Sequence, residues 1–115
     1  MKLNEVVGCR PTLELIAGKE MDGGAALEFA NFAKGILMEI QDFEMKRAEL
    51  FRKYGEELGE GEEKRIQVKP ENEKKFNTAI KRALGKEVNV EPFDLATLGI
   101  MISPAELVNA TMLFK

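Results

Sequence analysis

The chain has 115 residues, of which 44% are hydrophobic and 32% are charged, and its net charge is −3. This length is typical of one domain with one core, so we expect residues 1–115 to form a single domain. Because lysines and glutamates are interleaved, the sequence predicts no basic stripe for phosphate backbones, and we expect no nucleic acid partner. The chain has no histidine, which argues against zinc sites and catalytic triads.

The single cysteine, Cys9, has no second cysteine or histidine to pair with, so we interpret it as a small apolar residue of a helix. This cysteine content predicts a cytoplasmic protein. The residues Met1 to Glu5 have no apolar signal-peptide core, and no stretch approaches the length of a membrane span. We therefore expect neither secretion nor a membrane contact.

Apolar residues recur at helical spacing from Leu3 to Ala17, but Pro11 lies among them. Proline removes a backbone donor and clashes with the carbonyl four residues earlier. The segment is therefore predicted to be either one kinked helix or two short helices. If the helix breaks, Pro11 lies in the first turn of the second piece and Gly18 caps its end.

A long amphipathic helix is the clearest feature of the chain. Asp22 can cap it, its predicted range is Ala25 to Tyr54, and Gly55 ends it. Side chains spaced four, three, four and three residues apart share one helix face, which we call the seam. The seam consists of Phe29, Ala33, Ile36, Ile40, Phe43, Arg47, Leu50 and Tyr54, with Ala30, Leu37 and Phe51 on its flank.

The seam is predicted to be an interface between copies of the chain, because the first segment offers too little apolar surface to cover it. Arg47 either pairs with Glu44 or Glu49 of a neighbouring chain or lies where the seam is exposed. Met38 and Met45 lie on the opposite face, as a second protein contact or as ordinary exposed methionines. The candidate interface residues are Phe29, Ile36, Ile40, Phe43, Arg47, Leu50, Tyr54, Met38 and Met45.

The predicted parts of the domain are a helical hairpin or long-helix part at 3–57 and a small α+β part at 64–115. The acidic stretch Glu56 to Lys64 is predicted to be an exposed, mobile loop. Residues 65–68 and 87–91 alternate in polarity and are predicted to pair as a two-stranded sheet. A helix that starts near Pro70, ends at Gly85 and has Phe76 on its apolar face should lie across that sheet.

A capping box, Ser103-Pro104-Ala105-Glu106, predicts the start of a final helix. The apolar end Met112-Leu113-Phe114 is either an exposed contact site or folded back on the core. The predicted fold class is therefore mainly α (α+β), with a long amphipathic helix hairpin, a small two-stranded sheet, a helix lying on it, and a short C-terminal helix.

Catalytic chemistry has little support in the sequence. Carboxylate pairs such as Glu39 with Asp42, or Glu44 with Glu49, lie on the polar side or edge of the long helix and not in a pocket. The glycines match neither a phosphate-binding loop nor a dinucleotide fingerprint. We therefore expect no enzyme activity and no catalytic, cofactor-binding or metal-binding residues.

Short motifs along nearly the whole chain resemble a family of small uncharacterised proteins of tailed phages and prophages. The motifs are Leu3-Asn4-Glu5, Phe43-Glu44, Arg52-Lys53-Tyr54-Gly55-Glu56, Ile66-Gln67-Val68, Pro70-Glu71-Asn72, Val88-Asn89-Val90-Glu91-Pro92 and Ile102-Ser103-Pro104-Ala105-Glu106-Leu107. All of them are architectural. The family has no established activity, so the resemblance assigns no role to any residue.

These observations predict a non-enzymatic protein of phage or prophage type that acts through protein contacts in particle assembly. Its expected partners are a second copy, bound through the long helix, or another phage protein, in the host cell cytoplasm if the chain is phage-encoded. The alternative is a small regulatory or host-directed protein that binds nucleic acid or a host enzyme. A third possibility, ranked last, is an enzyme with a carboxylate-bound magnesium or manganese ion.

Overall fold

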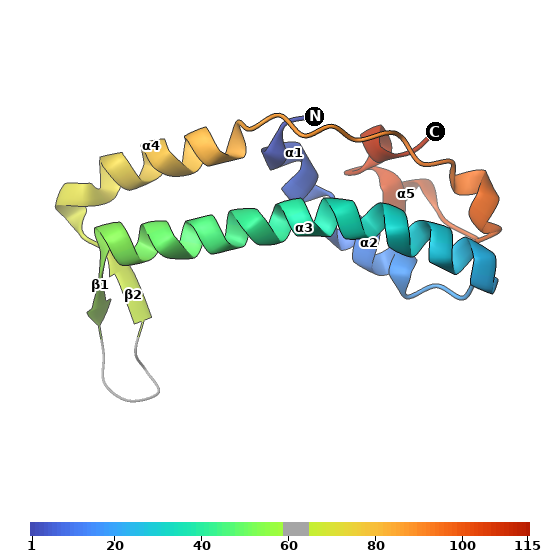
Figure 1. Ribbon diagram of the computed structural model, residues 1–115, viewed down its shortest axis with the longest axis horizontal. Coiled ribbons are helices and arrows are strands. Elements are labelled where there is room, and N and C mark those ends of the chain that lie inside the picture. Colours follow the sequence, from blue (N-terminus) through green and yellow to red (C-terminus); the bar gives the residue numbers. More distant parts are fainter. Residues whose placement is uncertain (59–64) are drawn as a thin grey trace. The chain divides into compact units, whose positions relative to one another are not determined.

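The computed structural model describes residues 1–58 and 65–115 (Figure 1). These residues form one long helix, shorter helices and a two-stranded antiparallel sheet, which confirms the predicted fold class. They group into two compact units. The first unit contains residues 1–40 and 87–115, and the second contains residues 41–86. The single domain with parts at 3–57 and 64–115 stays a prediction.

The first unit begins with two short helices, α1 (Leu3–Gly8) and α2 (Arg10–Ala17). Of the two predicted alternatives, the broken helix is therefore correct. Pro11 lies in the first turn of α2, where its missing N–H group has no helical partner to lose. Gly18 caps α2, and its N–H group donates to the carbonyls of Glu14 and Leu15 at 3.2 Å each.

The long helix α3 spans Gly23–Tyr54. Asp22 caps it, because its Oδ1 accepts a bond from the N–H group of Gly24 at 3.2 Å and its carbonyl accepts from Ala26 at 2.8 Å. The helix thus begins two residues before the predicted start. Gly23 and Gly24 are weak helix formers, and the cap compensates for them by binding free N–H groups of the first turn.

The core of the first unit holds the N-terminal half of α3 against the C-terminal tail. The phenylalanine rings of α3 and the tail pack together, with centroids of Phe32 and Phe93 4.9 Å apart and those of Phe29 and Phe93 6.0 Å apart. Phe114 joins this cluster through Phe32. The fully buried large side chains of the unit are Val6, Leu13, Ile16, Ile40 and Leu113.

The apolar C-terminus folds back on this core. The N–H group of Phe93 donates to the carbonyl of Leu113 at 2.7 Å, and that of Lys115 donates to the carbonyl of Phe93 at 2.9 Å. The side chain of Leu113, in the short 3₁₀ helix η4 (Thr111–Leu113), has no exposed surface. Of the two predicted alternatives for Met112-Leu113-Phe114, folding back is therefore correct, although Met112 is 42% exposed.

The predicted final helix forms as α5 (Pro104–Leu107). The carboxylate of Glu106 accepts bonds from the backbone N–H of Ser103 at 3.2 Å and from its hydroxyl at 3.1 Å. Lys19 adds an ion pair to Glu106 at 3.3 Å. The hydroxyl of Thr12 in α2 donates to the backbone carbonyl of Glu106 at 3.3 Å, so these contacts tie α5 to the first 19 residues.

In the second unit, β1 (Gly55–Leu58) pairs antiparallel with β2 (Arg65–Val68), with Gly55 opposite Val68. The prediction that residues 87–91 supply the second strand is therefore wrong. The start of the predicted acidic loop at Glu56 is also wrong, because three of its residues belong to β1. Acidic residues are rare in strands, and pairing with β2 overrides that preference here. The rest of that loop, residues 59–64, lies outside the described residues.

The second unit is completed by η2 (Pro70–Asn72) and α4 (Glu73–Leu84). Asn72 donates its side-chain N–H to the carbonyl of Tyr54 at 3.3 Å, which satisfies a free carbonyl at the end of α3. The rings of Phe51 in α3 and Phe76 in α4 lie 4.7 Å apart. The helix that we expected on the sheet therefore has the C-terminal half of α3 as a packing partner, beside which it runs in Figure 1.

The buried tail gives a first prediction. Leu113→Ala should lower the free energy of unfolding by about 2–5 kcal/mol, because it leaves a cavity in the core. The measurement is urea denaturation. Val108→Ala is the control, since Val108 is 67% exposed and its truncation should cost less than about 0.5 kcal/mol. Equal effects of the two substitutions would contradict a tail packed on the core.

The contacts of Glu106 give a second prediction. The backbone hydrogen bond from Ser103, and then Lys19, lower the pKa of this carboxyl from its usual 4.5. The folded state therefore binds the ionised form better, and this stabilisation is present above pH 4.5 and lost as the pH falls through the lower folded value. The difference in unfolding free energy between the wild type and Glu106→Gln should shrink as the pH falls below 4.5. A difference independent of pH in urea titrations would contradict the contacts.

Candidate functional site

The structure divides the predicted seam between the two units. In the first unit Phe29, Ile36 and Ile40 are buried within the chain itself, with 3%, 4% and 2% of their surface exposed. These side chains fill the core that α3 shares with the other segments of this unit. The N-terminal half of the seam therefore needs no partner subunit to cover it.

The second unit holds the remaining seam residues. Leu50 is buried, Phe43 and Tyr54 are half-buried, and Arg47 is exposed. The guanidinium carbon of Arg47 lies 5.4 Å from the centroid of the Phe51 ring, a cation–π contact within one chain. Arg47 thus lies on an exposed part of the seam, which is one of the two predicted alternatives. The other alternative, a pair with Glu44 or Glu49 of a neighbouring chain, stays a prediction.

The outward face of α3 in the first unit carries exposed apolar side chains. Leu27 is 64% exposed and Met38 is 55% exposed. Leu27 lies nine residues, or about two and a half turns, before the buried Ile36, so the two point to opposite sides of the helix. Leu37, which the pattern places on the flank of the seam, is 37% exposed. We call Leu27, Leu37 and Met38 the outward patch.

The sequence had indicated Met38 and Met45 on this face but had missed Leu27. Met45, in the second unit, is 59% exposed. Helix periodicity places Leu27 on this face as well, because Leu27 precedes Met38 by eleven residues, which is close to three full turns. The burial of Phe29 and Ile36 by segments far along the chain had no such local signal.

A groove of about 450 Å³ lies in the first unit between α3 and residues 87–91. Phe32 and Ile36 form its apolar floor, and Gly35 leaves open space beside them. The carboxylates on its lining belong to Glu39, Glu87 and Glu91. This groove was not predicted, because it depends on residues separated by about fifty positions in the sequence.

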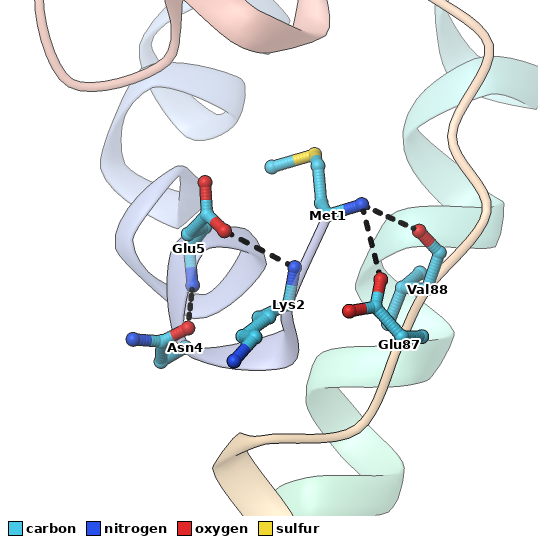
Figure 2. Close-up of polar contacts among 6 residues, drawn as sticks. All are labelled: Met1, Lys2, Asn4, Glu5, Glu87 and Val88. Carbon is cyan, nitrogen blue, oxygen red and sulfur yellow. Dashed lines mark hydrogen bonds and ion pairs between the residues drawn. The ribbon is translucent and has the colours of Figure 1, made fainter.

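The N-terminus is bonded to Glu87 and Val88, two residues that line this groove (Figure 2). The N–H group of Val88 donates to the carbonyl of Met1 at 2.7 Å, and the α-ammonium of Met1 donates to the carbonyl of Val88 at 3.2 Å. Glu87 lies 3.7 Å from the same ammonium. Lys2 and Glu87 form an antiparallel bridge, so the segment expected as a strand of the sheet pairs with the N-terminus instead.

Burial, and then the charge of Glu5, raise the pKa of Cys9 above its usual 9.0, so its thiol stays protonated at neutral pH. Among residues 1–58 and 65–115, no three Cys, Asp or Glu side chains are placed to hold a metal ion. No helix in this part of the chain has the length and hydropathy needed to cross a bilayer.

Comparison of the chain with models of protein families, with curated proteins and with solved structures finds no match. The likeness to phage and prophage proteins therefore stays a prediction from the motifs. The proposed function therefore rests on the properties of the surfaces.

Two glycines on α3 and at its end give a third prediction. A methyl group added at Gly35 meets nothing within 4 Å, so Gly35→Ala should raise the free energy of unfolding by about 0.5–1 kcal/mol through better helix propensity. A methyl group at Gly55 would overlap the carbonyl of Phe51 and lie 2.7 Å from Cγ2 of Ile66. Gly55→Ala should therefore destabilise the protein. Thermal and urea denaturation check both, and effects of the same sign would contradict the geometry.

Proposed function

We propose that the protein acts through protein–protein contacts and without catalysis of its own, and that it self-associates through α3 during assembly of a phage or prophage particle. The outward patch is the observation that carries this proposal. In this patch Leu27 is 64% exposed and Met38 is 55% exposed, whereas the opposite face of the same helix is buried in the core of the first unit. Grouped apolar side chains of this kind on a helix face favour a contact with another protein.

The best occupant of the outward patch is a second copy of the chain in antiparallel orientation. A two-fold axis between Asn31 and Lys34 places Leu27 of one copy against Met38 of the other, and does so twice. At the axis the amide oxygen of Asn31 can accept a hydrogen bond from the ammonium group of the facing Lys34. The patch is therefore complementary to itself.

A parallel pair would be less favourable. It would place Leu27 against Leu27 but also Lys34 against Lys34, and like charges at facing positions repel. The antiparallel arrangement avoids this repulsion and keeps both apolar contacts. Charge and apolarity thus support the same orientation.

The proposal keeps self-association through the long helix but moves it from the seam to the opposite face. Ile36 and Ile40 are buried by their own chain, so a partner could reach them only if the first unit opened. The outward patch needs no such opening. The role in particle assembly rests on the motifs that resemble phage and prophage proteins.

The test is the solution mass, measured by light scattering on a size-exclusion column over a range of concentrations. Wild-type chains should approach twice the 12.9 kDa of one chain as the concentration rises. Met38→Glu introduces a charge at both equivalent contacts of the dimer and should shift the mass to one chain. Met101→Glu is the matched control, because Met101 is 89% exposed and lies away from the patch in sequence.

Two outcomes would contradict the proposal. One is a wild-type protein that stays monomeric up to the highest concentration tested. The other is a dimer that Met101→Glu disrupts as strongly as Met38→Glu. Circular dichroism of each variant excludes a loss of fold as the cause.

A further inference from the structure

One face of α4 in the second unit is positively charged. Its residues follow the spacing i, i+1, i+4, i+7 and i+8, which keeps them on one side of a helix. The opposite face is apolar, and Phe76 and Ile80 on it are half-buried. We call the charged side the basic face, which consists of Lys74, Lys75, Thr78, Lys81 and Arg82.

The four cations of the basic face are all exposed. Within the described residues none of them has an ion-pair partner. Their positive charges are therefore not neutralised by ion pairs in the part of the chain that the structure describes. Four cations within nine residues also repel one another, so an anion bound to this face would relieve that repulsion.

Two hollows flank the middle of the basic face. One, of about 330 Å³, is lined by Tyr54 together with Lys74, Lys75 and Arg82. The other, of about 530 Å³, is lined by Lys74 and Lys81 together with Pro70, Glu73 and Asn77. Thr78 contributes to both, and its short side chain leaves room between the long cationic ones.

We propose that the basic face, with Tyr54, binds the phosphate backbone of a single-stranded nucleic acid. Lys74 and Arg82 are separated by about 12 Å along the helix, at 1.5 Å per residue, a length that several successive phosphates of a strand can span. Cations along a groove with an aromatic side chain beside them are the usual means of binding single strands, because the ring stacks on a base of any sequence. Tyr54 supplies the only aromatic ring that lines the first hollow in the described residues.

An acidic protein segment is the competing occupant of the same charges. It would use the lysines equally well but would make no stacking contact with Tyr54. The ring lies in one hollow with three of the four cations, and this combination favours a nucleic acid. The test separates the two partners.

The interleaved lysines and glutamates of the sequence predict no basic stripe and no nucleic acid partner. The charges are nevertheless distributed unevenly between the two units. The segments of the first unit contain ten acidic and five basic residues, whereas those of the second contain ten acidic and twelve basic residues. The helix α4 is therefore basic on one face although the net charge of the whole chain is −3.

The experiment is fluorescence anisotropy of a labelled 20-nucleotide single-stranded DNA titrated with the full chain at several salt concentrations. Binding should be measurable in the micromolar range at low salt. The slope of log K against log salt should be about −3, because each of four phosphate contacts contributes about −0.7. The double variant Lys74→Gln/Lys81→Gln should weaken binding at least about tenfold and make the slope shallower by about 1.4.

Lys2→Gln/Lys115→Gln is the matched control, since it changes the net charge equally with two exposed lysines outside the second unit. It should leave binding nearly unchanged. Tyr54→Leu should weaken single-strand binding at least about fivefold and affect a duplex of the same sequence less. Circular dichroism confirms that each variant is folded.

Three results would overturn the binding of nucleic acid to this face, and a fourth its assignment to single strands. The first is no binding at low salt with the chain in large excess, and the second is an equal loss in the control variant. The third is a polyglutamate probe of equal charge that binds as tightly as the DNA and loses binding with Lys74→Gln/Lys81→Gln, because that result would assign the face to an acidic protein. Unchanged single-strand binding by Tyr54→Leu would overturn the assignment to single strands.

Discussion

The burial of one face of α3 by the chain itself is the constraint on which the first unit depends. Phe29 and Ile36 lose nearly all their exposed surface there, and each large apolar side chain buried in this way contributes about 1.5–3 kcal/mol. The segments that cover this face come from both ends of the sequence, so the closed core requires the N-terminal residues and the C-terminal tail to be held in place. The pairing of Met1 with Val88 and that of Phe93 with Leu113 do this with backbone hydrogen bonds.

This arrangement explains which features the sequence could predict. Helix ends depend on a few neighbouring residues, and Asp22 and the Ser103–Glu106 capping box therefore indicated helix starts correctly, that of α3 to within two residues. Pro11 indicated an interruption but left open whether the helix kinks or breaks. Strand partners depend on pairing that can join any two segments. The alternation at 87–91 is real, but Val88 pairs with Met1, while the partner of β2 is a glutamate-containing strand that propensity disfavours.

The candidate surfaces also differ in whether neighbouring residues or residues far along the chain determine them. The outward position of Met38 followed from helix periodicity alone, and Leu27 could have been found in the same way. Whether the seam faces a partner or the chain's own core could not be decided locally, because the area that covers Ile36 belongs to segments without a recognisable link to α3. Composition also averages charge over the chain, whereas Lys74 and Lys81 lie together on one face of one helix.

The two surfaces differ in the physical interaction that would drive binding, and this difference separates their behaviour in solution. The proposed contacts of Leu27 and Met38 would depend on apolar area and change little with salt, whereas those of Lys74 and Arg82 would depend on the release of counterions and weaken steeply as salt rises. They also lie in different units, so a substitution in one surface leaves the residues of the other in place. Self-association and polyanion binding can therefore be measured independently in one chain, and a salt titration distinguishes them even before any residue is changed.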